Sequence, residues 1–290
     1  MTDRNTRPVL VTGATGTQGG AVARLLLERG QSVRALTRDP DRAEAKLLAE
    51  RGAEILVADF EDPESLRRAA TGTAAVFAMG TWTEGGAEVE TRQSIALIDA
   101  ASAAGTGHIV YSSVASALDR TGIPHFESKA RVERHLASLG TPATVVAPVA
   151  FLENVFAPWS APALAQGRYV FPLPADVPLQ QVAIADLAEF VALVLERPQR
   201  YAGQRVELAS VEVTGEQFAA ALSRWLGREV AYVEMPVDAA DEESRTMTAF
   251  FRERGYQVDI PALRAAYPQV AWRDLETWGA EQDWPELVPA

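Results

Sequence analysis

A glycine-rich segment, Thr12-Gly-Ala-Thr-Gly-Thr-Gln-Gly-Gly20, separates the first apolar run of the chain, residues 9–11, from a helical pattern. A strand, a glycine loop and a helix in this order are typical of the turn that binds a dinucleotide. Gly13 is expected to allow the tight turn, Gly16 the close approach of a pyrophosphate, and Gly19 the packing of helix on strand. Free N–H groups at the positive end of the helix favour the diphosphate. The other loop residues predicted to contact it are Thr15, Thr17 and Gln18. The alternative is a glycine-rich turn without a ligand.

Short apolar runs alternate with helical patterns through about residue 147. The runs that indicate buried strands are residues 9–11, 33–36, 55–57, 75–78, 109–111 and 144–147. The helical patterns are residues 19–29, 41–51, 64–70, 88–104 and 126–139. This alternation predicts an α/β fold with a doubly wound parallel sheet. We expect residues 1–150 to form the dinucleotide-binding domain.

The sequence changes character after Pro148. Residues 151–182 combine several prolines with large apolar side chains, which favours loops and short elements around a pocket. Thr214-Gly-Glu-Gln217 matches a capping box before a helix at residues 218–226. We therefore expect residues 151–290 to form a small α/β lobe for substrate or partner, interleaved with the end of the sheet.

The end of the second strand indicates which dinucleotide is bound. An NAD site usually has an acidic residue there, but this chain has Thr37 followed by Arg38. A guanidinium can pair with a 2′-phosphate, so Arg38 predicts NADP(H) rather than NAD(H). Asp39 is expected to be the N-cap of the next helix, with Pro40 at its first position. The alternative for Arg38 is a solvated surface charge.

Two further strand ends supply candidate cofactor contacts. Asp59 and Phe60 follow the third strand, where Asp59 could accept the adenine amine and Phe60 pack on the ring. The alternative is that Asp59 caps a helix, since Asp62-Pro-Glu64 comes next. Met79 and Gly80 follow the fourth strand and are expected beside the ribose or nicotinamide.

Composition excludes several classes of function. Twenty-seven Lys and Arg residues against 39 Asp and Glu give a formal charge of −12, which argues against direct binding of nucleic acid or an anionic membrane. The chain has no cysteine, so disulfides and thiol chemistry are excluded. Three histidines are too few to predict a metal site. We expect a cytoplasmic protein without a signal peptide or membrane span.

The residues then resemble a known family. The loop at residues 11–20, the segment Leu36-Thr-Arg-Asp-Pro40 and the segment His125-Phe-Glu-Ser-Lys129 are similar to the NmrA-like branch of atypical short-chain dehydrogenases/reductases. Phe151-Leu-Glu-Asn154 and the tail at residues 267–279 add to the resemblance. It implies a Rossmann domain that binds NADP(H), with Phe151 near the cofactor, and a C-terminal lobe. Some relatives reduce substrates with NADPH, whereas others sense the cofactor and bind a protein partner.

The resemblance also identifies the candidate catalytic residues. Short-chain dehydrogenases use Tyr-x-x-x-Lys, in which Tyr transfers a proton and Lys holds the ribose. This chain keeps the spacing with His125 in place of Tyr, so Lys129 is the expected ribose anchor and electrostatic catalyst. His125 could donate a proton or could simply begin a helix after Pro124. The usual serine partner is in doubt.

The sequence therefore supports two functions of different classes. The first is an NADPH-dependent reductase of a quinone, an enone or another bulky carbonyl acceptor that is planar and apolar. Aromatic residues proposed to line its pocket are Trp82, Phe151, Phe156, Trp159 and Phe171. The second is a redox-sensing regulator that catalyses nothing and acts through a protein partner.

Overall fold

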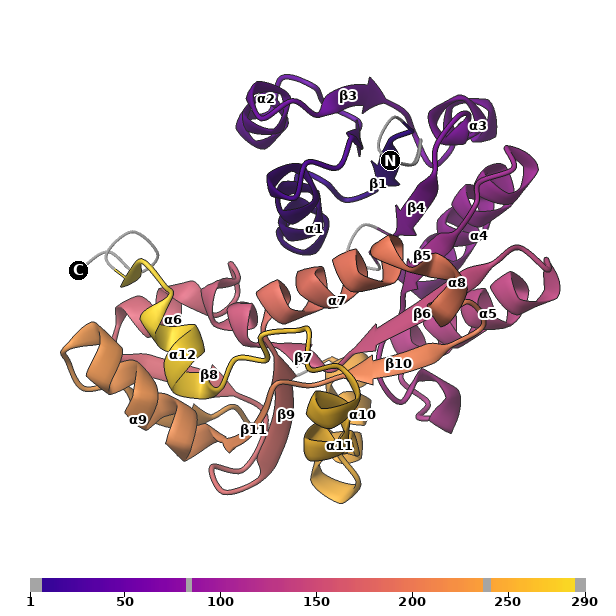
Figure 1. Ribbon diagram of the computed structural model, residues 1–290. Helices are drawn as coiled ribbons and strands as arrows, with labels where there is room; N and C mark the ends of the chain where they lie inside the picture. The colour runs from indigo at the N-terminus through magenta and orange to yellow at the C-terminus, as the bar shows by residue number, and fades with distance from the viewer. Residues whose placement is uncertain (1–6, 82–84, 237–240, 285–290) are drawn as a thin grey trace. The chain divides into compact units, whose positions relative to one another are not determined.

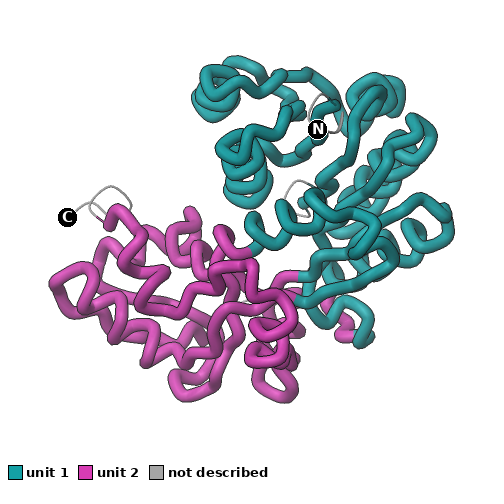
Figure 2. Tube along the Cα trace, viewed as in Figure 1, with its two compact units in different colours: residues 1–120, 124–147, 187–207 teal, residues 121–123, 148–186, 208–290 magenta. Residues whose placement is uncertain are grey.

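The computed structural model describes residues 7–81, 85–236 and 241–284, and the chain forms two compact units (Figure 2). Unit 1 comprises Met1–Arg120, Pro124–Ala147 and Leu187–Glu207. Unit 2 comprises Thr121–Ile123, Pro148–Asp186 and Leu208–Ala290. Apart from the short segment Thr121–Ile123, the chain passes to unit 2 at Pro148, and Leu187–Glu207 returns to unit 1. Trp82 lies outside the described residues.

Unit 1 contains a seven-stranded sheet in the order β10-β6-β5-β4-β1-β2-β3 (Figure 1). Its strands are β1 (Val9–Val11), β2 (Val33–Thr37), β3 (Glu54–Val57), β4 (Ala75–Ala78), β5 (Ile109–Ser112), β6 (Ala143–Pro148) and β10 (Arg205–Leu208). The pairs from β6 to β3 are parallel. The chain runs outward from β1 in one direction through β2 and β3, then in the other through β4, β5 and β6. This order is that of the Rossmann fold, so the predicted fold class is confirmed.

The helices of unit 1 cover the sheet because their apolar stripes match its buried strands. They are α1 (Thr17–Glu28), α2 (Ala43–Glu50), α3 (Pro63–Ala70), α4 (Gly86–Ala103), α5 (Pro124–Ser138), α7 (Ile184–Glu196) and α8 (Pro198–Tyr201). Helix α4 packs between α3 and α5. Leu66, Ile98 and Leu136 from these three helices join Val76 and Tyr111 of the sheet in one buried core. This layer fixes the ends of β4 and β5 against α4 and α5.

Unit 2 is an α/β unit built on two small sheets. One has the order β11-β9-β7, with β7 (Ala150–Phe151), β9 (Pro178–Val182) and β11 (Val211–Thr214); the other pairs β8 (Arg168–Phe171) with β12 (Ala231–Glu234). Its helices are α6 (Ala161–Ala165), α9 (Gly215–Leu226), α10 (Glu242–Glu253), α11 (Ile260–Ala266) and α12 (Leu275–Ala280), besides the 3₁₀ helix η3 (Leu152–Phe156). The predicted capping box is present: Thr214 accepts from the Gln217 backbone N–H, and the Gln217 side chain accepts from that of Thr214. Tyr169, Phe218 and Trp278 belong to its aromatic core.

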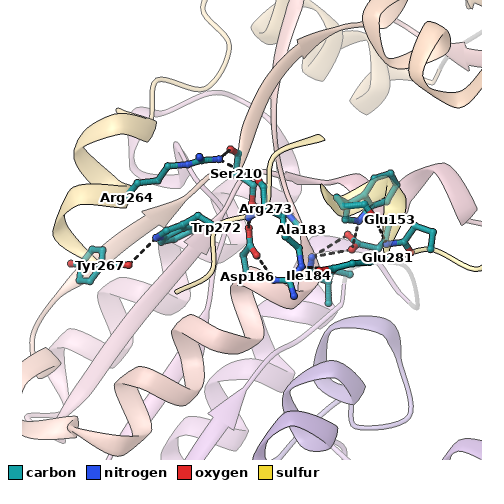
Figure 3. Close-up of polar contacts among 12 residues, drawn as sticks. Glu153, Ala183, Ile184, Asp186, Ser210, Arg264, Tyr267, Trp272, Arg273 and Glu281 are labelled. Atoms are coloured by element: carbon teal, nitrogen blue, oxygen red, sulfur yellow. Dashed lines mark hydrogen bonds and ion pairs between the residues drawn. The ribbon is translucent and has the colours of Figure 1, made fainter. Parts of the chain in front are cut away.

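Two carboxylates, buried Asp186 and half-buried Glu153, bind the C-terminal segment within unit 2 (Figure 3). Asp186 forms an ion pair with Arg273 at 2.7 Å and accepts from the Ser210 hydroxyl at 2.5 Å. Glu153 accepts from the Ile184 backbone N–H at 3.1 Å and from the Trp278 indole N–H at 2.9 Å. Burial raises the pKa of both carboxyl groups, although these donors oppose the shift. These contacts explain why the tail can pack without a long regular element.

Across the described residues, each helix is too short or too polar to cross a membrane.

Candidate functional site

The glycine loop connects β1 directly to α1, and the glycines at positions 13, 16 and 19 differ in their backbone angles and in the space around them. Gly13 has a φ of 62°, in the left-handed region, and its carbonyl accepts from the Gly16 N–H at 2.9 Å. A Cβ at Gly19 would lie 2.4 Å from the backbone oxygens of Thr12 and Gly13, so helix and strand can approach only at a glycine. A Cβ at Gly16 would meet nothing closer than 3.4 Å. Packing within the protein therefore leaves space at Gly16.

Thr12 fixes the loop to the neighbouring strand. Its buried hydroxyl lies 3.1 Å from the Met79 carbonyl oxygen and accepts from the Met79 backbone N–H at 2.9 Å. Because β1 and β4 are the strands at which the chain reverses its direction across the sheet, this contact sets the geometry of the switch point. The sequence analysis quoted Thr12 in the motif but gave it no role.

A cavity of about 570 Å³ opens at the carboxyl ends of β1 to β4, all within unit 1. The predicted site residues that line it are Gly13, Thr15, Gly16, Thr17, Gln18, Arg38, Asp59, Phe60, Met79 and Gly80. Lining residues that were not predicted are Leu36, Thr37, Asp39, Arg42 and Gln93, and Thr81 lines the cavity next to Gly80. Gly19 lies in the first turn of α1, and Phe151 belongs to β7 of unit 2, so its contact with a cofactor remains a prediction.

The end of β2 brings two guanidinium groups to the cavity. Arg38 and Arg42 both line it, and Arg42 forms an ion pair with Glu44 at 3.4 Å. The prediction that Asp39 is the helix N-cap is wrong, because α2 begins at Ala43 with Arg42 as its N-cap. The Asp39 carboxylate instead accepts from the Asp41 backbone N–H at 2.9 Å and so closes a turn before the helix.

The end of β3 resolves the two interpretations of Asp59. The N-cap of α3 is Asp62, whose carboxylate accepts from the backbone N–H groups of Glu64 and Ser65. Asp59 accepts only the Glu61 N–H among the described contacts of its carboxylate, at 2.9 Å, and it lines the cavity. Phe60 packs on the core of unit 1 and also lines the cavity. Both residues are thus placed where an adenine contact is possible.

Lys129 lies behind the cavity wall. Its ammonium forms an ion pair with Glu90 at 2.8 Å and donates to the carbonyl oxygens of Gly80, at 3.3 Å, and Ser112, at 3.4 Å. Only 8% of Lys129 is exposed. His125 is half-buried in the first turn of α5, with its ring edge-on to Phe126. In the described part of the chain, neither His125 nor Lys129 lines the cavity, so their catalytic roles remain predictions.

The hydroxyl of Ser113, which follows β5, hydrogen-bonds to another side chain of unit 1. The Ser113 hydroxyl donates to Glu133, which is also paired with Arg205 at 2.8 Å. Arg205 in turn donates to the Val114 carbonyl oxygen at 3.0 Å. The loop after β5 is therefore tied to β10, the edge strand that the chain adds after residue 187.

The lining of the cavity fits a dinucleotide. Gly16 leaves open space at the start of a helix, where the unpaired N–H groups favour phosphate. The family model described as the NmrA-like family matches residues 5–275. The chain belongs to the NmrA-like family.

Two relatives of this NmrA-like chain are named as an oxidoreductase and a reductase. It is 34% identical over 166 residues to the NmrA-like oxidoreductase FrzB of Cladobotryum sp., a match that spans 53% of this chain and about half (49%) of that protein. It is 33% identical over 235 residues to a (4-alkanoyl-5-oxo-2,5-dihydrofuran-3-yl)methyl phosphate reductase of Streptomyces griseus subsp. griseus, covering 80% of this chain and 78% of that protein.

Solved structures share the fold over nearly the whole chain. A triphenylmethane reductase of Citrobacter sp., complexed with NADP(H), superposes with a TM-score of 0.78 at 21% identity and covers 94% of this chain and 99% of its own. NmrA, a negative transcriptional regulator, in complex with NADP, superposes with a TM-score of 0.77 at 22% identity and covers 97% of each chain. The NmrA-like fold thus occurs in an enzyme and in a regulator.

Proposed function

We propose that this NmrA-like protein binds NADP(H) in the unit 1 cavity and reduces a quinone, an enone or another bulky carbonyl compound. One observation carries the cofactor assignment. The same cavity is lined by the glycine loop at the start of α1 and by two arginines, Arg38 and Arg42, at the end of β2. Thr37 occupies the strand end where a carboxylate would favour the unphosphorylated ribose of NAD.

Each part of the cavity has a role in this proposal. The backbone N–H groups in the first turn of α1 hold the diphosphate, and Arg38 and Arg42 pair with the 2′-phosphate. Asp59 accepts from the adenine amine while Phe60 packs against the ring. Met79 and Gly80 then bound the nicotinamide side of the cavity. Bound NADPH would supply a hydride, and the protein orients it and excludes water from it.

The proton that a reduced carbonyl requires has one candidate donor in the sequence motif. His125 is half-buried at the start of α5, one helical turn before Lys129. An imidazole can donate a proton at neutral pH, so we assign this step to His125 for acceptors that form an alkoxide. Acceptors that delocalise the charge, such as quinones, need the donor less.

The proposed acceptor class rests on the names of the relatives. The Streptomyces relative is named for reducing an oxo-dihydrofuran and the Citrobacter structure for reducing triphenylmethane compounds. Of the predicted aromatic residues, Phe156 and Phe171 pack on the core of unit 2, but Trp159 is 74% exposed.

The test is NADPH oxidation, followed by the absorbance of the reduced nicotinamide, with a panel of quinones, enones and ketones. We expect turnover with at least one quinone or enone, and loss of turnover in Lys129→Ala. His125→Phe should slow ketone reduction more than quinone reduction. Tight NADPH binding without turnover, together with a protein partner captured only with one redox state, would contradict the reductase and support the regulator.

A further inference from the structure

A buried ion pair lies directly behind the part of the cavity wall formed by Gly80. Glu90 of α4 and Lys129 of α5 meet at 2.8 Å, with side chains 0% and 10% exposed. Two charges removed from water to this extent are costly unless each satisfies the other, so the pair must be held in a defined geometry. The sequence analysis singled out Lys129 but not Glu90.

The Lys129 ammonium also donates to the backbone at the ends of two strands. Besides Glu90, it has the carbonyl oxygens of Gly80 and Ser112 within 3.4 Å. Gly80 follows β4, and Ser112 is the last residue of β5. One cation therefore bridges the carboxyl ends of two neighbouring strands, and Gly80 is a cavity-lining residue.

Helix α4 contacts Gly80 from the same side. A Cβ at Gly80 would lie 2.4 Å from the Ser94 hydroxyl oxygen and 3.3 Å from Cγ of Glu90. The second oxygen of the Glu90 carboxylate accepts from the Ser128 hydroxyl at 2.5 Å. Glu90 is thus oriented by α5, packs against Gly80, and supplies the charge that keeps the Lys129 ammonium in place.

We infer that Glu90 is a positioning residue of the cofactor cavity, acting through Lys129 on the backbone of Gly80. This inference rests on the proposed function for the ligand of the cavity. Without the Glu90 charge, the Lys129 ammonium would be buried without a counter-ion, and moving it toward water would release the Gly80 carbonyl. The wall beside the nicotinamide would then lose its fixed position.

The experiment compares Glu90→Gln with Glu88→Gln, a matched control on the same helix whose carboxylate pairs with Arg131 and is 81% exposed. Hydrogen exchange of the amides at residues 75–81 is measured without cofactor, and the NADPH Kd is measured by titration. We expect Glu90→Gln to speed this exchange and to raise the Kd about tenfold, the size of coupling seen between contacting residues. Glu88→Gln should change neither.

The double variant Glu90→Gln/Lys129→Met guards against simple misfolding, because it leaves neither buried charge unpaired. We expect it to recover thermal stability relative to Glu90→Gln while exchange at residues 75–81 stays fast. Unchanged exchange and Kd in a folded Glu90→Gln protein would overturn the inference, even if wild-type protein binds NADPH. Failure of the wild-type protein to bind NADPH would overturn the proposed function instead, and the exchange result would still decide whether Glu90 positions Gly80.

Discussion

At the scale of single residues, two glycines of one loop are required for different reasons. Gly19 is required by the fold, since a Cβ there would overlap backbone oxygens at 2.4 Å. Gly16 has a φ of −101°, which any residue can adopt, and a Cβ there would meet only the Gly13 carbonyl oxygen, at 3.4 Å. The proposed reason for glycine at position 16 is the approach of a ligand to the backbone, so Gly16 is expected to affect binding and Gly19 stability.

Gly16→Ala should therefore weaken NADPH binding, whereas Gly19→Ala should lower the stability of the fold. Gly16→Ala is expected to change the free energy of unfolding by no more than about 1 kcal/mol and to weaken NADPH roughly tenfold or more. Gly19→Ala should destabilise the fold by about 3 kcal/mol, because the overlap forces backbone to move. Urea unfolding and NADPH titration of both variants check this, and equal NADPH affinity in Gly16→Ala and wild type would contradict it.

His108 is a buried histidine with a structural role. Its Nε2 lies 2.9 Å from the Thr144 hydroxyl, which donates its own hydrogen to the Tyr201 carbonyl oxygen. The imidazole must therefore donate from Nε2. Burial lowers the pKa of His108 to about 4, from an ordinary value of 6.5.

Acid should consequently destabilise the fold through His108. Between the two pKa values the unfolded chain binds a proton that the folded protein does not, so this contribution to stability is lost as the pH falls from 6.5 toward 4. Lowering the pH from 7 to 5 should cost about 2 kcal/mol from this group. Urea unfolding of wild type and His108→Gln at both pH values measures it; the same pH dependence in both proteins would refute the assignment.

At the scale of elements, local signals in the sequence locate helix starts well when the cap is adjacent. The capping box at Thr214 is present, and Pro63 begins α3 directly after the Asp62 cap. Asp39 was misassigned because an aspartate before proline closes a turn as readily as it caps a helix. The preference of aspartate for turns and caps is a local property. The choice between a turn and a helix cap at Asp39 depends on where the surrounding structure lets α2 begin.

Thr214→Ala should destabilise unit 2 by about 1 kcal/mol, since it removes the hydroxyl that accepts from the Gln217 N–H at the start of α9. The NADPH Kd should stay unchanged, because the proposed site lies in unit 1. Thermal unfolding and NADPH titration test both expectations. Thr214→Ser, which keeps the hydroxyl at the cap, is the matched control and should leave stability nearly unchanged.

The site residues that could be predicted are those that follow the end of a strand in the sequence. Gly16, Arg38 and Asp59 each come directly after an apolar run, and the parallel sheet brings those ends together. Glu90 and Gln93 were missed because α4 reaches the site through packing with residues far along the chain, such as Lys129. No spacing rule connects a helix face to a cavity formed by other elements.

At the scale of the whole molecule, the return of residues 187–207 to unit 1 could not be inferred from periodicity. Helix α7 and strand β10 look like any helix and strand in sequence, and only pairing with the sheet assigns them to unit 1.

The net charge of −12 also bears on how the cavity can bind an anionic ligand. An acidic protein must gather positive groups locally to hold a triply phosphorylated dinucleotide, and here the start of α1, Arg38 and Arg42 do so.

The most direct test of the central claim is calorimetric titration of NADPH and NADH into wild-type protein and Arg38→Ala. Arg67→Ala, which removes an exposed arginine paired with Glu64, is the control. We expect wild type to bind NADPH at least about tenfold more tightly than NADH, because a guanidinium–phosphate pair is charge-assisted. Arg38→Ala should lower that preference by weakening NADPH alone. Equal affinity of the wild-type protein for both dinucleotides, or no binding of either, would contradict the account.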